Sequence, residues 1–442
     1  MKSPAKQLLY LFKNKLFKDL NLSSKLQFLD QNTILEHQNE KFIKLINHAK
    51  LNVPYYSIIL KDVTSISDIS TLPFLTKRII KERFSDLKAK NLTENDFIEN
   101  STSGSTGESM HFYSYKQDHY SEACAIRGDM FTGWEYGEKK VIIWGATRDI
   151  DKHLGFKQNF IKKYIQKFEI FSSFYLSTKD IENYLIQISK FKPSILIGYP
   201  TALYLIAEHI LLNNKDVHIP KGIISAGETL YDFQRDSIER AFNQKVFNRY
   251  GCRDVFQIAS ECSSHNGLHI SVDHVVLEII NEKGEKAKPG EVGELVVTDL
   301  DNYAFPLIRY KIGDIGILKD SEYKCKCGVN LPMLEKIEGR TMDVIVGSNG
   351  NRVSGNFWTL LFRHEFHGIE KFQVIQEVEN LINLFFEINS SYNSSEENRI
   401  KKEIRLVLGE NFEVCINIVD KISQTATGKH RWIISNITPY AQ

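Results

Sequence analysis

Residues 194–251, "SILIGYPTALYLIAEHILLNNKDVHIPKGIISAGETLYDFQRDSIERAFNQKVFNRYG", decide the fold. Three short runs rich in Ile and Val, each bounded by Gly or Pro, predict buried strands at 194–200, 222–228 and 245–251. The segments between them, 201–212 and 231–242, carry helical patterns. A strand, helix, strand, helix, strand order predicts a parallel sheet with crossover helices.

A fourth buried run, "KVIIWGA" at 140–146, extends this sheet. In open parallel sheets, ligands bind beyond the carboxyl ends of the strands. The residues expected at that edge are Tyr199, Gly227, Glu228, Tyr250 and Gly251.

The flanking regions follow different patterns. Residues 1–90 read as helices joined by short loops, and residues 274–300 as an antiparallel hairpin. From Phe372 onward, two strands, a helix and a strand predict a small α+β domain. We therefore expect an α/β fold in which a large N-terminal domain carries a small C-terminal one. The expected divisions are 1–90 (helical part), 91–339 (core) and 340–442 (small domain), with the boundary between Gly339 and Asp343.

The overall composition is that of an ordinary globular protein. Hydrophobic residues make up 42% and charged residues 25% of the 442 residues, and the formal net charge is +1. A balanced charge argues against nucleic acid as a partner. Because Lys interrupts the apolar runs near the N-terminus and no run is long enough to cross a bilayer, we expect a cytoplasmic protein.

A stretch of Ser, Thr and Gly, "STSGSTGESM", occupies residues 101–110. Backbone N–H groups of such a loop can turn inward and hold phosphate oxygens, while Gly permits close approach. The stretch is not a Walker A motif, because Glu108 follows Gly107 where that motif has Lys. Taken alone, it is equally compatible with a flexible linker.

Six motifs in a characteristic order separate these alternatives. They are "TSGSTG" at 102–107, "SAGE" at 225–228, "RYG" at 249–251, "PLIRYKIGD" at 306–314, "GRTMD" at 339–343 and "TATGKHRW" at 425–432. The chain thereby resembles the adenylate-forming superfamily. Through "NVPYY", "LPFLTK", "SECSSHNGLH" and "TDLDNYAFPLIRY" it is similar to the phenylacetate-CoA ligase branch and its CapK-type capsular-polysaccharide relatives.

This resemblance implies an enzyme that uses ATP and Mg²⁺ to convert a carboxylic acid to an acyl adenylate and then transfers the acyl group. It assigns a phosphate loop to Ser103, Gly104, Ser105, Thr106 and Gly107, and an adenine site to Gly227, Glu228, Tyr250 and Gly251. Asp314 matches the ribose-binding carboxylate, and Arg340 would lie nearby.

Two positions depart from the family pattern. Asp254 stands where many relatives have the magnesium-binding Glu, and its side chain is one methylene shorter. Glu108 stands where relatives often place a Lys after the phosphate loop. The alternative for Asp254 is an ordinary solvated carboxylate in a loop.

Lys429 in "TGKHRW" matches the lysine that the mobile small domain brings to the site for adenylation, with a hinge at Asp343. As an isolated feature, Lys429 would be a solvent-exposed lysine in a turn.

The cysteines indicate a structural zinc site. Cys325 and Cys327 form "CKCG", and Cys262 precedes His265 and His269 in "ECSSHNGLH". Three thiolates and one imidazole would complete a tetrahedral site. The resemblance favours His269 as the fourth ligand. The alternative is a set of ordinary reduced thiols with a surface histidine.

The acyl pocket and the acceptor are the least determined parts of the site. Trp134, Trp144 and Tyr199 are candidates to line a pocket for the acid, or alternatively are core aromatics. We expect an AMP-forming acyl ligase with coenzyme A as acceptor, in a capsule or cell-surface polysaccharide pathway. The alternatives are an amide-forming ligase that uses an amine acceptor, such as an amino sugar or amino acid, and a non-catalytic member that only binds nucleotide or acyl groups.

Overall fold

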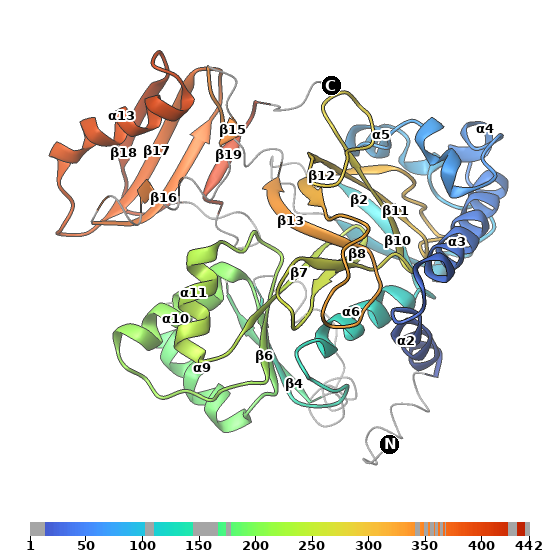
Figure 1. The fold of residues 1–442 in the computed structure, drawn as a ribbon, viewed down its shortest axis with the longest axis horizontal. Coiled ribbons are helices and arrows are strands. Elements are labelled where there is room, and N and C mark those ends of the chain that lie inside the picture. Colours follow the sequence, from blue (N-terminus) through green and yellow to red (C-terminus); the bar gives the residue numbers. More distant parts are fainter. Residues whose placement is uncertain are drawn as a thin grey trace.

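The structure of the chain is a computed structural model (Figure 1). It describes residues 14–101, 110–144, 167–173, 178–340, 345–348, 352–353, 358, 361–362, 366, 368–422 and 431–437. Within these ranges an 11-stranded sheet forms the body of the molecule, and a four-stranded sheet near the C-terminus stands beside it.

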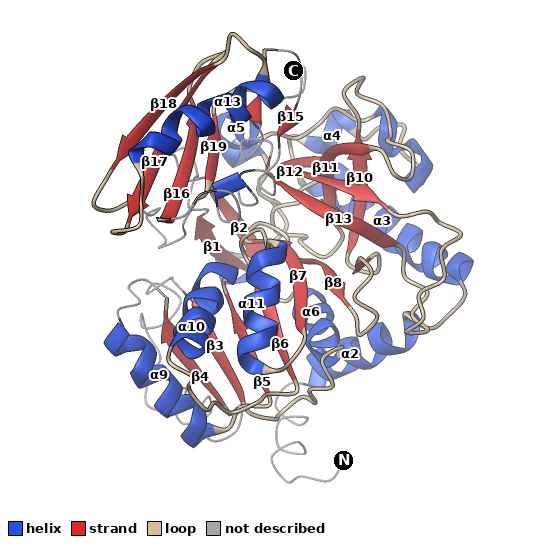
Figure 2. Cartoon of the chain, turned by 60° about the vertical axis from the view of Figure 1, so that its left-hand side comes forward, coloured by secondary structure: helices blue, strands red, loops and turns tan. Residues whose placement is uncertain are grey.

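One half of the large sheet is parallel, as the sequence predicts. Its strands lie in the order β4, β3, β5, β6, β7. They span Phe168–Ser172 (β4), Lys140–Trp144 (β3), Ile195–Gly198 (β5), Gly222–Ala226 (β6) and Val246–Cys252 (β7). The crossover helices are α9 (Thr178–Phe191), α10 (Pro200–Leu212) and α11 (Asp232–Phe242), which lie together over one face of these strands (Figure 2).

Both faces of the parallel half are covered, and this explains its continuous apolar strands. In β5, Leu196 packs with residues of α9, α10 and α11, whereas Ile195 and Ile197 pack on the opposite face. That second face is covered by α2 (Asn14–Leu26) and α6 (Tyr120–Met130). Because successive side chains in a strand point to opposite faces, a strand buried on both sides is apolar at every position.

The other half of the large sheet is antiparallel and continues in the order β8, β9, β13, β12, β11, β10. These strands span Phe256–Glu261 (β8), Leu268–Ile270 (β9), Met333–Arg340 (β13), Tyr310–Leu318 (β12), Val292–Asp299 (β11) and Val275–Ile280 (β10). The hairpin predicted at 274–300 is confirmed, because β10 pairs with β11 from Val275 opposite Asp299.

The N-terminal region is helical, as expected. It contains α2, α3 (Gln31–Asn52), α4 (Tyr56–Ile59), α5 (Lys77–Glu82) and the short 3₁₀ turns Ile66–Thr71, Phe84–Asp86 and Glu94–Asp96. The side chain of Asp30 caps α3 by accepting a hydrogen bond from Thr33 N, and Pro54 follows the end of the helix. None of the helices within the described ranges is long and apolar enough to cross a membrane.

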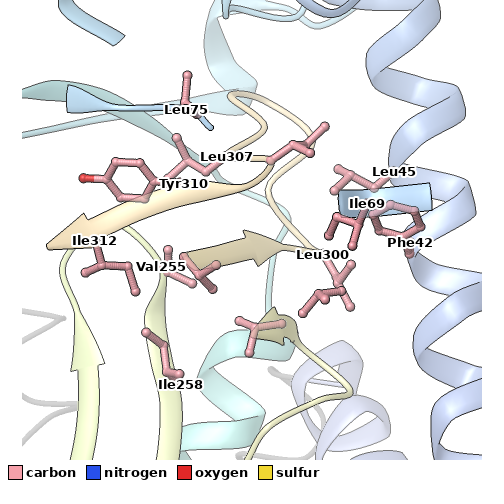
Figure 3. Packing of buried hydrophobic residues seen from close by; sticks show 14 of the residues in the cluster. Phe42, Leu45, Ile69, Leu75, Val255, Ile258, Leu300, Leu307, Tyr310 and Ile312 are labelled. Atoms are coloured by element: carbon pink, nitrogen blue, oxygen red, sulfur yellow. The ribbon is translucent and has the colours of Figure 1, made fainter. Parts of the chain in front are cut away.

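The largest hydrophobic core joins this helical region to the antiparallel strands (Figure 3). Phe42 and Leu45 of α3 are buried in the same cluster as Leu300 and Tyr310. The helices therefore support the strands on which several of the predicted site residues lie.

The small C-terminal sheet has the order β18, β17, β16, β19. Its elements are β16 (Ile369–Gln376), β17 (Leu381–Ile388), a 3₁₀ turn (Ser394–Glu396), α13 (Glu397–Leu408), β18 (Glu413–Ile418) and β19 (Ile433–Ser435), and the short β14 (Ile345–Val346) pairs with β15 (Arg352–Val353) nearby. The predicted strand, strand, helix, strand set is confirmed. Strand β19, parallel to β16, was not predicted, because three residues show no periodicity. The domain boundary at Gly339 to Asp343 stays a prediction, since residues 341–344 lie outside the described ranges.

An aromatic contact connects the small sheet to α11. The Trp432 ring lies 4.8 Å from the Phe372 ring of β16 and 6.3 Å from the Phe233 ring of α11, measured between centroids. Tyr231, which precedes α11, is buried in the same cluster as the core of the small sheet. The two parts of the molecule therefore share apolar packing at this point.

A buried ionic cluster lies behind the antiparallel strands. His274 Nε2 faces the carbonyl oxygen of Val255 at 3.0 Å, and its Nδ1 lies 2.8 Å from an Asp301 carboxylate oxygen. Asp301 also pairs with Lys41 of α3 at 2.7 Å. Burial disfavours the charged imidazole, but Asp301 and Asp299 together raise the pKa of His274 to about 9. We infer that His274 is a cation in the folded chain and helps to fix the turn that contains Val255.

Replacement of His274 by Gln is expected to change how stability depends on pH. A folded-state pKa of about 9, above the ordinary 6.5, means that the charged imidazole stabilises the fold fully below pH 6.5. This contribution, on the order of 3 kcal/mol, is lost as pH rises through 9. Urea unfolding at pH 7.5 and pH 9 measures it. Wild type should lose stability between these values, and His274→Gln should lose much less.

Buried Asp299 must be separated from this effect. Burial raises the pKa of Asp299 from 3.8 to about 7, so the fold loses stability as the pH rises between these two values and the buried carboxyl ionises. The comparison above pH 7.5 therefore reports chiefly on His274. Parallel pH profiles for wild type and His274→Gln in that interval would contradict the assignment.

Candidate active site

The predicted phosphate loop is carried by a hairpin. Strand β1 (Phe97–Ser101) pairs with β2 (His111–Tyr115), and the last pair before the loop is Ser101 opposite His111. Ser103, Gly104, Ser105, Thr106 and Gly107 lie outside the described residues, so their role stays a prediction. Met110, at the end of the loop, is buried, and its sulfur lies 4.0 Å from the Tyr310 hydroxyl. Met110, which follows the loop, therefore lies beside Tyr310 of β12.

The carboxyl end of β6 is shaped by a glycine. Gly227 follows the strand with a φ of +82°, a conformation that side chains other than Gly rarely adopt. A Cβ atom at this position would lie 2.8 Å from the ring of Tyr199. The Tyr199 and Trp144 rings are 4.2 Å apart, so both aromatics lie beside this glycine. A Glu228 carboxylate oxygen accepts a hydrogen bond from Thr201 N at the start of α10.

Trp134 is not part of this group, contrary to its inclusion among the pocket candidates. It is buried in a separate cluster with Phe17 and Tyr136, and its indole N–H donates to the Glu138 carbonyl oxygen at 3.2 Å. The alternative of a core aromatic is therefore correct for Trp134. Trp144 and Tyr199 do lie together at the strand ends, where the prediction placed them.

Two predicted site carboxylates are each held by a tyrosine. The Tyr250 hydroxyl of β7 donates to Asp314 of β12 at 2.8 Å. The Tyr310 hydroxyl of β12 donates to Asp254, in the turn between β7 and β8, at 2.7 Å. Burial, and then the charges of Asp254 and Asp314, raise the pKa of the Cys252 thiol. Both carboxylates therefore act electrostatically on Cys252.

The close approach of two strands explains why position 251 is a glycine. A Cβ atom there would lie 1.9 Å from the carbonyl oxygen of Phe256, across the turn between β7 and β8. Glycine is therefore required where these strands approach closely. Arg340 is the last residue of β13 and pairs with Asp314, so its backbone lies where the sequence predicted.

Lys429 and the predicted hinge at Asp343 lie outside the described residues. Trp432, which is anchored against Phe233 of α11, follows Lys429 by three positions in the sequence. The helix α11 begins shortly after Gly227 and Glu228. Trp432, three positions after Lys429, therefore lies against α11, the helix that follows the predicted adenine site.

Asp254 offers one oxygen ligand of the kind that a magnesium ion uses. Mg²⁺ prefers oxygen ligands and is usually bound by one or two carboxylates together with substrate phosphates. Asp254 is 7% exposed, and the Tyr310 hydroxyl contacts both its carboxylate and the sulfur of Met110, which follows the predicted phosphate loop. Asp254 would therefore supply one ligand to such an ion.

The four predicted zinc ligands come together in space. One ligand atom each of Cys262, His269, Cys325 and Cys327 lies within 4.8 Å of the others. The Cys327 sulfur is 3.3 Å from His269 Nε2, and the Cys262 and Cys325 sulfurs are 3.6 Å apart. Three sulfurs and one imidazole nitrogen suit tetrahedral Zn²⁺ and leave no open position for catalysis.

The surroundings of His269 match a metal ligand. Its Nδ1 lies 3.3 Å from the Leu331 carbonyl oxygen, to which it donates, so the lone pair is on Nε2, the atom that faces Cys327. Burial lowers the pKa of His269 to about 4, which keeps the ring neutral. His265 instead pairs with Glu261 at 3.0 Å, so the choice of His269 agrees with the geometry.

Comparisons with known proteins give three relevant similarities. The model of the CapK C-terminal domain matches residues 345–436. Protein CapK of Staphylococcus aureus is 29% identical over 423 residues, which are 92% of this chain and 90% of that protein. The phenylacetate-coenzyme A ligase of Pseudomonas putida is 26% identical over 70% of this chain and 71% of its own length.

The chain is similar to CapK and to the phenylacetate-coenzyme A ligases. A solved structure of similar fold, 2-hydroxyisobutyryl-CoA ligase in the postadenylation state with an acyl adenylate bound, has a TM-score of 0.72 at 16% sequence identity and covers 93% of this chain and 91% of its own. The α/β fold with an added C-terminal part, expected from the sequence, is therefore confirmed.

Tyr310 contacts a predicted site residue but has no role predicted from the sequence. It lies within "PLIRYKIGD", where the motif draws attention to Asp314. A tyrosine that begins a strand just before a predicted ligand-binding carboxylate is the only available signal in the sequence. Its contact with Asp254, 56 positions away, cannot be seen without the fold.

Metal analysis of the native protein is expected to find about one zinc ion per chain. Cys262→Ser should lose that zinc and lower the melting temperature, because the ion joins the β8–β9 loop to the β12–β13 loop. Cys415→Ser, in β18, is the matched control and should keep the zinc. A native protein without zinc, whose stability Cys262→Ser leaves unchanged, would refute the site.

Proposed function

We propose that this chain activates a carboxylic acid with ATP, releasing pyrophosphate and forming an acyl adenylate, and transfers the acyl group to coenzyme A. Like the phenylacetate-CoA ligases to which it is similar, the chain is an AMP-forming acyl ligase. The proposal adds two points to this activity: coenzyme A as the acceptor, and the pathway in which the chain acts. The likeness to CapK favours a capsule or cell-surface polysaccharide pathway.

One observation supports the proposal: contacts of two tyrosines connect candidate site residues that are far apart in the sequence. Tyr250 of β7 contacts Asp314, and Tyr310 of β12 contacts both Asp254 and Met110, which follows the Ser/Thr/Gly loop. Adenylation needs donors around the phosphates, a cation and a ribose anchor in one place, because negative charge must be balanced during the attack.

The proposed roles follow from this arrangement. Backbone N–H groups of residues 103–107 would bind phosphate oxygens, and Asp314, oriented by Tyr250, would accept hydrogen bonds from the ribose hydroxyls. Lys429 would donate to the α-phosphate as charge develops there. Asp254 would hold Mg²⁺, which supplies positive charge to the phosphates. The aromatic pair of Trp144 and Tyr199 would border the acid.

The zinc cluster has a structural part in this proposal. Its four protein ligands would join two loops at the antiparallel side of the sheet, near Phe131, whose ring centroid lies 5.9 Å from that of His269. It would stabilise β8, which follows the turn of Asp254, and β12, which carries Asp314, without contacting substrate.

The decisive experiment is exchange of labelled pyrophosphate into ATP with Mg²⁺, screened over aromatic acids, short fatty acids, amino acids and uronic acids. We expect one class of acid to stimulate exchange, and Lys429→Ala to slow it by about 10²- to 10³-fold. Lys402→Ala, an exposed lysine on α13, is the matched control and should exchange at the wild-type rate.

The outcomes distinguish the alternatives. Product formation with coenzyme A, and not with amino sugars or amino acids, would support the thioester route, and the reverse would establish an amide-forming ligase. Nucleotide binding without exchange for any acid would replace the proposal with a non-catalytic binding protein. Exchange by Lys429→Ala at the normal rate would exclude the role given to that lysine.

A further inference from the structure

Tyr310 is fully buried, and its hydroxyl makes polar contacts at one end of the side chain. Its ring lies in the large core with Leu75, Val255 and Ile312, whereas its hydroxyl points away from them (Figure 3). The hydroxyl donates to Asp254 Oδ2 at 2.7 Å and lies 4.0 Å from the Met110 sulfur. The packing of the ring thus fixes where the hydroxyl donor stands.

The Tyr310 hydroxyl is the donor in its contact with Asp254. An ionised carboxylate can only accept hydrogen bonds, so the proton of this 2.7 Å contact comes from the hydroxyl. A hydrogen bond to a carboxylate is stronger and more directional than one between neutral groups.

The backbone at Tyr310 is held from both sides. Leu75 bridges to it in parallel, through hydrogen bonds from Leu75 N to the Arg309 oxygen and from Lys311 N to the Leu75 oxygen, both 2.9 Å. Arg309 has a φ of +54°, which is uncommon for a side chain of its size. Its guanidinium is buried and pairs with Glu278 at 3.2 Å. An unusual backbone conformation kept in place by buried contacts is a feature of functional sites.

We propose that Tyr310 is a positioning residue that orients the Asp254 carboxylate toward a divalent cation. The proposal rests on the proposed function, and it addresses the departure at Asp254, where the side chain is shorter than the Glu of many relatives. A short side chain reaches a metal only from a narrow range of orientations, so a second group that fixes the carboxylate is required. Tyr310 supplies that group from β12, the strand that also carries Asp314.

The test uses Tyr310→Phe, which keeps the ring and removes the hydroxyl. Tyr120→Phe is the matched control, because the Tyr120 hydroxyl also donates to a buried carboxylate, that of Asp273, at 3.1 Å. Arg127 holds Asp273 independently, and this pair lies outside the proposed site. Thermal melting of both variants verifies that each is folded and measures the cost of losing one buried hydrogen bond.

The direct measurement is binding of Mn²⁺ by electron paramagnetic resonance in the presence of α,β-methylene-ATP, which needs no turnover. We expect Tyr310→Phe to raise the Mn²⁺ dissociation constant by about 10-fold, as is typical when a partner of a metal ligand is removed. Tyr120→Phe should leave it within about twofold of wild type. In pyrophosphate exchange, Tyr310→Phe should need more Mg²⁺ for half-maximal rate, with most of the rate recovered at saturating Mg²⁺.

A double-mutant cycle tests whether Tyr310 acts through Asp254. In an Asp254→Ala background, adding Tyr310→Phe should cause no further loss of Mn²⁺ affinity. Unchanged Mn²⁺ affinity in Tyr310→Phe, or an equal loss with and without Asp254, would overturn the proposal. A wild-type chain that binds Mn²⁺ and nucleotide without exchange activity would refute the proposed function while leaving this comparison of affinities intact.

Discussion

Strand β7 is the element on which the rest of the structure depends. It hydrogen-bonds to β6 in parallel on one side and to β8 in antiparallel fashion on the other, so the two halves of the large sheet meet along it. The approach of β8 leaves no room for a side chain at Gly251. Because the chain must reverse immediately after this point, Asp254 is placed in the reversing turn, and Tyr250 is left pointing to Asp314 of β12.

Local patterns in the sequence were sufficient to predict most of the fold. The parallel strands contain apolar runs because both faces of this half of the sheet are covered, and the crossover helices between them fix their direction. Strand β19 escaped prediction because it exists only through pairing with β16, a tertiary interaction. Long periodic segments carry their own signal, whereas short ones are defined by what lies beside them.

Site residues could be predicted from the sequence where a short motif contains residues suited to one kind of chemistry. A contact between two segments that are distant in the sequence could not be predicted. Cys325 and Cys327 are separated by one residue, and the clustering of thiols was visible before the structure. The Tyr310–Asp254 contact joins the start of β12 to the turn after β7, and only the order of strands in the sheet brings them together. Residues 102–109 and 423–430 lie outside the described ranges, so the loop and Lys429 stay predictions.

The contact of Trp432 with Phe233 has a thermodynamic meaning for any movement of the small sheet. Trp432 is buried against an element of the large sheet's own crossover layer, so a rotation that separates the two would expose aromatic surface to water. The free-energy cost of exposing that surface would favour the present arrangement of the two parts. A ligand shifts the population to another arrangement only if it binds that arrangement more tightly than the present one, by at least this free energy.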